Sequence, residues 1–529
     1  MSNLEDISRS RLDQIRRLTQ IGVALSAEKN IDRLLESIID EARRLTNADG
    51  GTLYILSEDG ECLRFAIVQN DTLHVRMGGA SDPISWPPVC LRFDESTENR
   101  TQVSAYAALT GEVVNIADVY HAEGFNFEGT RRFDAQTGYR SKSMLVVPMR
   151  NHEQEIIGVV QLLNALDPET GDVVPFSAES QLMAESIASQ AAVALSKNTL
   201  IHDLENLLQS FITTIAAAID EKSPYTGGHV RRVAELTMTI AQAVNDQQEG
   251  PFSKIHWSAD EMQELRYAAW LHDVGKITTP EFVVDKATKL ETIFDRIKLV
   301  EARLELMIRE REIELLREAM GRNGDVPKVE TLESDPVIAG LRDDMAFLRR
   351  INTGGEFLAD SLLERLNAIA CRRRTLDGKE TNLLTEDEVE NLSIRRGTLT
   401  EREREVINNH VRVTYKMLSQ LPFPKKLGHV AEYAGAHHEK LDGSGYPDGR
   451  REEELSLQSR ILALADIFEA LTAKDRPYKK GKTLREALDI MKFMVKDRHI
   501  DTDLFDLFVQ RRIYLHYAEK ELSPQQIDC

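Results

Sequence analysis

The sequence predicts a multidomain protein in which an α+β domain, a long helix and an all-α domain follow one another. Its 529 residues are enough for roughly two to four domains. Short β-branched or apolar runs bounded by glycine, aspartate and asparagine gather between residues 51 and 163 and predict strands. No proline or glycine occurs from Ser180 to Ile219, which favours one unbroken helix. From Thr226 onward, apolar residues recur mostly at helical spacing.

Composition excludes several classes of protein. Lys and Arg total 66 and Asp and Glu total 87, which gives a net charge of −21 and argues against a nucleic-acid coat or a basic membrane-surface protein. The four cysteines, Cys62, Cys90, Cys371 and Cys529, lie far apart without a CxxC pair, as in a reduced intracellular protein. The charged first residues and the lack of a long apolar run predict a soluble, cytoplasmic protein.

The α+β domain is expected over residues 26–197, after an N-terminal helix in residues 1–25. A 3–4 repeat of apolar residues predicts a helix from Ile31 to about Asn47. A closing helix is expected from Ala178 onward. Between these helices the sequence predicts strands at Gly51–Leu56, Leu63–Gln69, Met144–Pro148 and Ile156–Leu163.

A linker helix is expected over residues 198–220. Its apolar residues follow one another at steps of 4, 3, 4, 4 and 3, a heptad-like seam formed by Leu200, Leu204, Leu207, Phe211, Ile215 and Ala218. One interpretation is a helix packed on its own domain. The other, which we favour because the seam is longer than one domain face, is a signalling helix in a homodimer.

The all-α domain is expected in two parts, residues 221–288 and 397–529, separated by a helical insertion over 289–396. Apolar stripes beginning at Ile293, Leu341 and Leu358, with charged residues on the other faces, predict a helical hairpin in this insertion. It contributes no metal-binding cluster. Two roles remain open, a lid over an active site or a docking surface for a protein partner, and we favour docking.

The histidines of the all-α domain fall in places that make chemical sense together. His272–Asp273 follows the apolar helix end RYAAWL, and His437–His438 closes the run AEYAGA. Asp466 interrupts an apolar helical face, where an ionised carboxylate is costly unless a positive group pairs with it. Imidazoles with carboxylates suit divalent iron or manganese, and the lack of thiolates disfavours a structural zinc site. Any one of these residues alone is weak evidence, but the ordered set is specific.

Two segments carry a resemblance to a known family. HDVGK (His272–Lys276) and HHEKLDGSGYPDG (His437–Gly449) resemble an HD-GYP domain, the bacterial branch of the HD phosphohydrolases. The segments YTGGHVRRV, LTEREREVINNH and ILALADIFEALTAKDRPYKK resemble it as well. The resemblance implies hydrolysis of cyclic di-GMP to pGpG or GMP with two or three divalent metal ions, iron or manganese being favoured. Alternatives are a hydrolase of 3′,3′-cyclic GMP-AMP or another phosphoester, and a catalytically weak receptor that acts through protein partners.

The resemblance also implies roles for residues. Asp273 would bridge two metals, and Lys276 would neutralise charge or protonate the leaving oxygen. The implied metal ligands are His229, His272, Asp273, His410, His437, His438 and Asp466. The implied substrate-binding residues are Lys276, Asp442, Gly443, Tyr446, Arg476 and Lys479. Val230 and Glu469 depart conservatively from the family pattern, whereas the insertion departs from it strongly.

The α+β domain is similar to a GAF domain. The similarity rests on NIADVYHAEGFN, TGYRSKSMLVVPM and IIGVVQLLNA, which are closest to the cyclic-nucleotide-binding kind. That kind has a lysine after its asparagine, whereas Asn164 is followed here by Ala165. The resemblance implies a sensor for a small molecule or cyclic nucleotide, or else a plain dimerisation module. The partners expected are therefore the dinucleotide, a GAF ligand, a second copy of the chain and a protein at the insertion, with no nucleic-acid polymer and no membrane.

Overall fold

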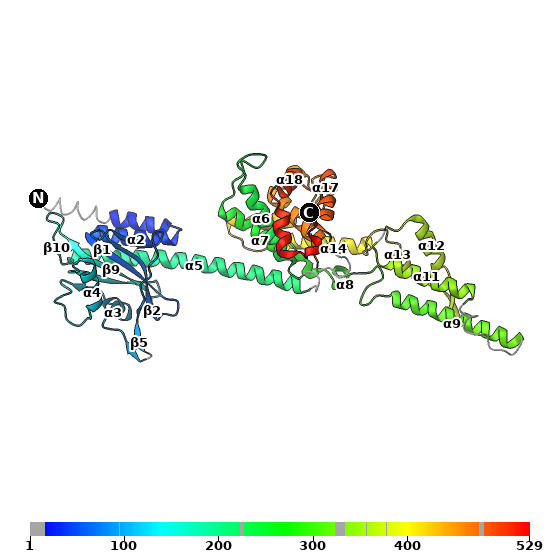
Figure 1. Ribbon diagram of the computed structural model, residues 1–529, viewed down its shortest axis with the longest axis horizontal. Helices are drawn as coiled ribbons and strands as arrows, with labels where there is room; N and C mark the ends of the chain where they lie inside the picture. Colours follow the sequence, from blue (N-terminus) through cyan, green and yellow to red (C-terminus); the bar gives the residue numbers. More distant parts are fainter. Residues whose placement is uncertain are drawn as a thin grey trace. The chain divides into compact units, whose positions relative to one another are not determined.

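The computed structural model describes residues 16–94, 96–222, 227–322, 334–355, 357–376, 378–474 and 481–529. The chain forms two compact units, Met1–Leu207 and Leu208–Cys529 (Figure 1). The α+β and all-α classes predicted for the two parts are confirmed. None of the described helices combines the length and apolar character that crossing a bilayer requires.

The N-terminal unit contains an antiparallel sheet whose central strands were predicted. Strands run in the order β3-β2-β1-β9-β8-β7, with β10 beside β9 and β4 beside β2. Each predicted strand is longer than expected, and the short outer strands were missed because they are too short to show alternation. The bounds are β1 Ala48–Leu56, β2 Cys62–Asn70, β3 Val75–Gly78, β4 Val89–Cys90, β7 Val114–Ile116, β8 Met144–Arg150, β9 Ile156–Leu166 and β10 Val173–Val174, with a separate hairpin of β5 Arg92–Asp94 and β6 Thr97–Glu98.

Helices cover both faces of this sheet. Successive residues of a strand point to opposite faces, so Leu53 of β1 packs with α2 (Ile31–Thr46) and the start of α5 (Ala178–Lys222). The next residue, Tyr54, packs on the other face with α3 (Val103–Thr110). The small helix α4 (Glu128–Thr137) follows β7 in the chain. The sheet is therefore the middle layer of the unit.

Helix α5 runs unbroken for 45 residues, as predicted. Ile212 and Ile219 pack into the second unit's core. The seam residues are exposed, and the large ones range from 43% at Ile215 to 60% at Leu200. The seam is therefore not covered by the described residues of its own chain.

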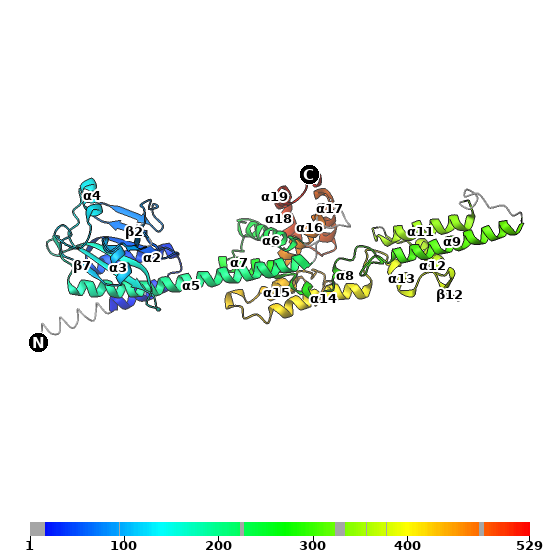
Figure 2. The ribbon, with the colours of Figure 1, turned by 90° about the horizontal axis from the view of Figure 1, so that it is seen from below.

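The second unit is built mainly from helices (Figure 2). Its main core is formed by α6, α7, α16, α17, α18 and α19, and a smaller one joins the end of α5 to α7, α14 and α15. The bounds are α6 His229–Asn245, α7 Ala259–Leu271, η1 Val274–Thr278, α8 Glu281–Val284, α14 Glu401–Leu418, α15 Val430–Gly435, α16 Leu457–Thr472, α17 Leu484–Lys496, α18 Thr502–Gln510 and α19 Ile513–Glu521.

The insertion has a hydrophobic core of its own. Helices α9 (Ile297–Arg322) and α11 (Pro336–Asn352) pack together. The helices α12 (Asp360–Ala370) and α13 (Glu386–Leu392) contribute residues to the same core. A two-stranded sheet, β11 (Arg373–Leu376) with β12 (Lys379–Asn382), was not predicted. The placement of Ile293 in an apolar stripe was wrong. It is 96% exposed because it precedes the start of α9, where helical spacing does not apply.

Candidate metal centre

The seven predicted metal ligands come together in one cluster of the second unit, although they are spread over more than 230 residues of the sequence. Five elements supply them: His229 begins α6, and His272 and Asp273 lie between α7 and η1. The remaining four are His410 in α14, His437 and His438 just after α15, and Asp466 in α16. All are buried except His438, which is half-buried.

The cluster divides into two groups of potential ligands. His229, His272 and Asp273 form one group, and His410, His437 and His438 form the other, each with its ligand atoms within 4.8 Å of one another. The rings of His272 and His437 join the groups, with centroids 4.9 Å apart. Two cation sites next to each other are therefore geometrically available.

Two carboxylates lie between the groups. Asp273 Oδ2 is 3.5 Å from Nε2 of both His229 and His272, whereas its Oδ1 is 3.2 Å from His410 Nε2. Asp466 Oδ1 is 3.4 Å from His229 Nε2, and its Oδ2 is 4.0 Å from His438 Nδ1. Each carboxylate thus offers one oxygen to each group, which is the arrangement a bridging ligand needs.

Three imidazole rings are held by a hydrogen bond at one nitrogen, which leaves the other nitrogen available to bind. Nδ1 of His272, His410 and His437 lies 2.8, 2.6 and 2.6 Å from the carbonyl oxygen three residues earlier. A carbonyl only accepts, so Nδ1 carries the proton and Nε2 keeps its lone pair. These three Nε2 atoms and Asp273 Oδ1 are buried without a hydrogen-bond partner among the described residues. Burial lowers the pKa of His437 to about 3, so the ring stays neutral.

His229 is oriented differently, by Glu469. Its Nδ1 lies 2.5 Å from Glu469 Oε2, and the other Glu469 oxygen accepts from Arg232 Nε at 2.8 Å. Burial disfavours the charged carboxylate, but His229 and Arg232 lower the pKa of Glu469 to about 2. Sequence reasoning treated Glu469 only as a conservative replacement. Its position three residues after Asp466, on the same side of a buried helix, was the available signal.

The HDVGK turn is packed tightly against α14. A Cβ on Gly275 would lie 2.0 Å from the carbonyl oxygen of His410, so only glycine fits there. Thr414 Oγ1 accepts from Gly275 N–H at 2.9 Å and donates to the His272 carbonyl at 3.1 Å. Lys276 Nζ then lies 2.5 Å from Asp273 Oδ2, which places its charge beside the cluster.

The end of α5 contacts this same turn. Lys222 Nζ donates to the carbonyl oxygens of Lys276, Ile277 and Thr279 at 3.1, 2.6 and 2.7 Å. The contact was not predicted, because nothing in the sequence marks one lysine near a helix end as a partner of a distant turn.

The loop after His438 is organised by a buried carboxylate. Glu439 accepts the backbone N–H groups of Asp448, Gly449 and Arg450 at 2.7, 3.2 and 3.0 Å. The loop places the ring of Tyr446 4.9 Å from that of His438.

The remaining predicted substrate-binding residues are not all at the cluster. Asp442 is exposed, and its carboxylate accepts Ser444 N–H at 2.9 Å within the loop's own turn. Gly443 has a φ of +81° and shapes that turn. Arg476 and Lys479 lie outside the described residues.

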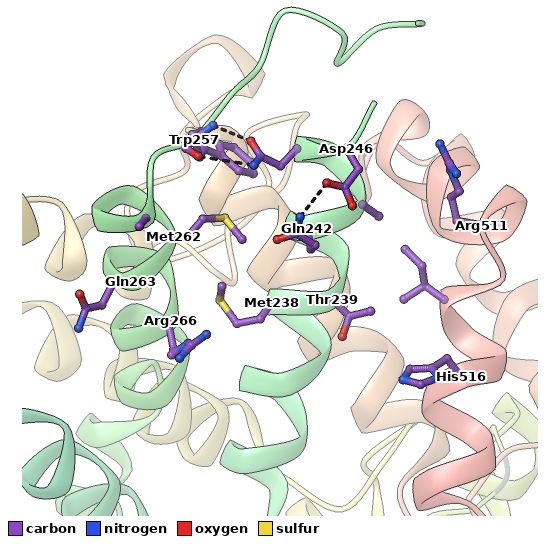
Figure 3. A pocket seen from close by; sticks show the side chains of 14 residues that line it. Met238, Thr239, Gln242, Asp246, Trp257, Met262, Gln263, Arg266, Arg511 and His516 are labelled. Atoms are coloured by element: carbon purple, nitrogen blue, oxygen red, sulfur yellow. Dashed lines mark hydrogen bonds between the residues drawn. The ribbon is translucent and has the colours of Figure 1, made fainter. Parts of the chain in front are cut away.

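A wide groove of about 970 Å³ lies elsewhere in the unit, between α6, α7 and α19 (Figure 3). Met238, Trp257 and Met262 form its apolar part, and Gln242 donates to Asp246 at its edge. None of the seven clustered residues lines it. A small hollow lined by Asp273, Lys276 and Lys222 lies beside the cluster.

Comparisons with known proteins identify the two parts of the chain. The protein-family model of the GAF domain matches residues 30–195, and two family models of the HD domain match residues 226–333 and 386–504. The chain joins a GAF domain to an HD domain. The GAF domain resembles that of an Acinetobacter phosphoenolpyruvate-protein phosphotransferase, with 14% identity and a TM-score of 0.26 over 37% of this chain and 98% of that one.

Two curated relatives show what the HD domain is similar to. One is the 3′3′-cGAMP-specific phosphodiesterase 1 of Vibrio cholerae, 41% identical over 97 residues, or 18% of this chain and 22% of the relative. Another is the cyclic di-GMP phosphodiesterase of Thermotoga maritima, 42% identical over 95 residues, or 18% and 25%. The alignments span about a quarter or less of these two relatives. Over these stretches the chain is similar to phosphodiesterases of cyclic dinucleotides.

Proposed function

We propose that the HD domain is a metal-dependent phosphodiesterase that hydrolyses cyclic di-GMP to pGpG, GMP or both. The observation that carries this proposal is the set of four buried ligand atoms, three imidazole nitrogens and one carboxylate oxygen, that have no partner among the described residues. Such atoms are costly to bury unless something else binds them. The names of the relatives support the choice of a cyclic dinucleotide as substrate.

The residues present fit two divalent cations. The group of His229, His272 and Asp273 would hold one, and the group of His410, His437 and His438 the other, with Asp273 and Asp466 between them. Nitrogen and oxygen ligands without thiolates suit iron or manganese. Bound metals would polarise the phosphodiester and supply an activated water.

The protein's own residues would orient the substrate and balance its charge. Lys276 carries its ammonium beside Asp273, where it can neutralise developing phosphate charge or donate a proton to the leaving oxygen. Tyr446 lies against His438 and offers a ring on which a base could stack. We assign phosphate binding to Arg476 and Lys479 on the family resemblance alone.

A second candidate substrate is 3′,3′-cyclic GMP-AMP, because relatives named for that activity match as well as those named for cyclic di-GMP. A receptor without activity is disfavoured, since all seven candidate ligands and Lys276 are present. We further propose that the GAF domain regulates the HD domain through α5 in a homodimer. The exposed seam of α5 supports this part of the proposal.

The test is hydrolysis by purified full-length protein prepared without oxygen and loaded with iron or manganese. Metal content is measured first, and the products from cyclic di-GMP and from cyclic GMP-AMP are then separated by chromatography. We expect cleavage of at least one dinucleotide, with cyclic di-GMP the faster. Cleavage of neither by metal-loaded protein would overturn the proposed function.

A further inference from the structure

Two cysteines that are 28 residues apart in the sequence meet on the GAF domain. Cys62 of β2 and Cys90 of β4 are direct partners in the antiparallel register. Their sulfur atoms are 2.7 Å apart, with the Cys62 thiol donating to Cys90 Sγ. Neither residue belongs to the HD domain, and the proposed hydrolysis gives them no role.

The backbone places this pair where a disulfide can form. Leu91 N–H donates to the Glu61 carbonyl at 2.8 Å, so the neighbouring Cys62–Cys90 pair is a non-hydrogen-bonded one. The backbone N–H and carbonyl of Cys62 are both used by Ser57 instead, at 3.0 and 2.8 Å. Side chains of non-hydrogen-bonded pairs approach most closely, and their Cα separation of about 4.5 Å lies within the range of disulfides.

The partner strand is held in place by a buried side chain. Asn99 is 2% exposed, and its Nδ2 donates to the Cys90 carbonyl at 2.8 Å. The backbone N–H of Asn99 also donates to the Leu91 carbonyl at 2.7 Å. The two sulfurs are thus kept together by bonds on both strands, and not by chance contact of flexible side chains.

The two thiols differ in access. Cys90 is exposed, whereas Cys62 is half-buried. Cys90 also lines a hollow of about 430 Å³ with the aromatic rings of Phe65, Trp86 and Phe93. The hydrogen bond from Cys62 to Cys90 raises the pKa of Cys62 to about 11, so Cys62 keeps its proton. An oxidant would therefore reach Cys90 first.

We propose that Cys62 and Cys90 are a reversible redox pair of the GAF domain, oxidised by hydrogen peroxide. The Cys90 thiolate attacks one peroxide oxygen and the O–O bond breaks, which gives Cys90 sulfenic acid and hydroxide. The hydroxide takes up the proton that Cys90 had released and becomes water. Cys62 sulfur then attacks the sulfenic sulfur, the S–S bond forms, and the hydroxyl leaves as water with the Cys62 proton. Two thiols lose two electrons and the peroxide becomes two waters. The disulfide would fix β4 on β2, along the wall of the aromatic hollow, and a dithiol would reverse it.

The test uses the full chain with Cys371→Ser and Cys529→Ser, which removes the other two thiols. After treatment with hydrogen peroxide, intact mass and peptide mapping report the loss of two hydrogen atoms and a bond between residues 62 and 90. Dithiothreitol should restore both thiols to alkylation. In the same background, Cys62→Ser should stop at a sulfenic acid on Cys90 that dimedone traps, and Cys90→Ser should lose the reaction of Cys62 with peroxide.

Circular dichroism of each variant shows whether it is folded. Two results would overturn the proposal: both thiols remain open to alkylation in folded, peroxide-treated protein, or disulfides form only between molecules. Because no step involves the HD domain, either result would leave the proposed hydrolysis standing.

Discussion

Asp273 lies between the two groups of potential ligands, and its two oxygens face different imidazoles. Asp273→Asn keeps the size of the side chain and removes its charge. We expect hydrolysis to fall by more than about 100-fold and bound metal to decrease, since outer-sphere changes alone cost about 10- to 100-fold. The measurement is turnover together with elemental analysis. Asp489→Asn, on the exposed surface of α17, is the matched control, and equal activity in both variants would contradict the bridging assignment.

Glu469 illustrates how a residue outside the ligand set can control one ligand. It contacts His229 Nδ1 and Arg232, so it fixes which His229 nitrogen faces the centre. Glu469→Gln should weaken metal binding by about 10- to 100-fold while leaving turnover of fully loaded enzyme close to normal. Metal titration followed by kinetics at saturating metal separates the two effects. A loss of turnover that saturating metal does not repair would show a different role.

At the scale of elements, the end of α5 and the HDVGK turn form one hydrogen-bonded unit. Lys222→Met removes three bonds to the turn that carries Lys276, and Lys222→Arg retains a cation there. We expect the methionine variant to lose about 10-fold in turnover with normal metal content, because a misplaced catalytic group is costly. The arginine variant should lose less.

The control for Lys222 lies on the same helix. Lys197 Nζ donates to the Ser26 carbonyl at 2.9 Å in the GAF domain, so Lys197→Met removes a comparable bond far along α5 from the turn. Equal losses from the two methionine variants would mean that general weakening of α5, and not the contact with the turn, lowers turnover.

At the scale of the whole molecule, the exposed seam of α5 is a surface on which two chains could pair. Leu204 and Leu207 are 56% and 53% exposed in a single chain, and apolar residues at heptad spacing are the usual contact of paired helices. Leu204→Glu with Leu207→Glu should convert a dimer to a monomer, measured by sedimentation at micromolar concentration. Glu205→Gln with Asn206→Gln, two neighbouring changes off the seam, should leave the dimer intact. A parent protein that is already monomeric would remove the basis for the seam.

The insertion is expected to be dispensable for hydrolysis. Thr398 Oγ1 donates to the Lys286 carbonyl at 2.9 Å, so the two ends of the insertion lie together and a short linker can join them. Lys286 also pairs with Glu403 at 2.8 Å, outside the removed segment. Replacing residues 289–396 by a Gly/Ser linker should leave dinucleotide hydrolysis largely intact, as expected for a docking surface.

Dinucleotide hydrolysis by the variant without the insertion is measured on folded, metal-loaded protein. Lost hydrolysis in such protein would show that the insertion helps to build the active site, and the docking role would be withdrawn. Retained hydrolysis with no change in stability would agree with the insertion having a core of its own.

The sequence determined the order of the two domains, the central strands and the unbroken helix α5, because these features are written in local periodicity. It also supplied the seven residues of the candidate centre, since their types and order are specific. The placement of Ile293 was wrong because the spacing of apolar residues does not show where a helix begins. The β11–β12 hairpin was missed because short polar strands show no alternation of apolar and polar residues.

Only the tertiary structure decided which distant groups meet. It brought Glu469 to His229 and Lys222 to the turn after Asp273, and it paired Cys62 with Cys90, two thiols that the sequence presented as unrelated. Contacts of this kind depend on how helices and strands pack, and packing has no signature in a single segment of sequence. Local pattern therefore fixes which residues are available, while packing fixes their partners.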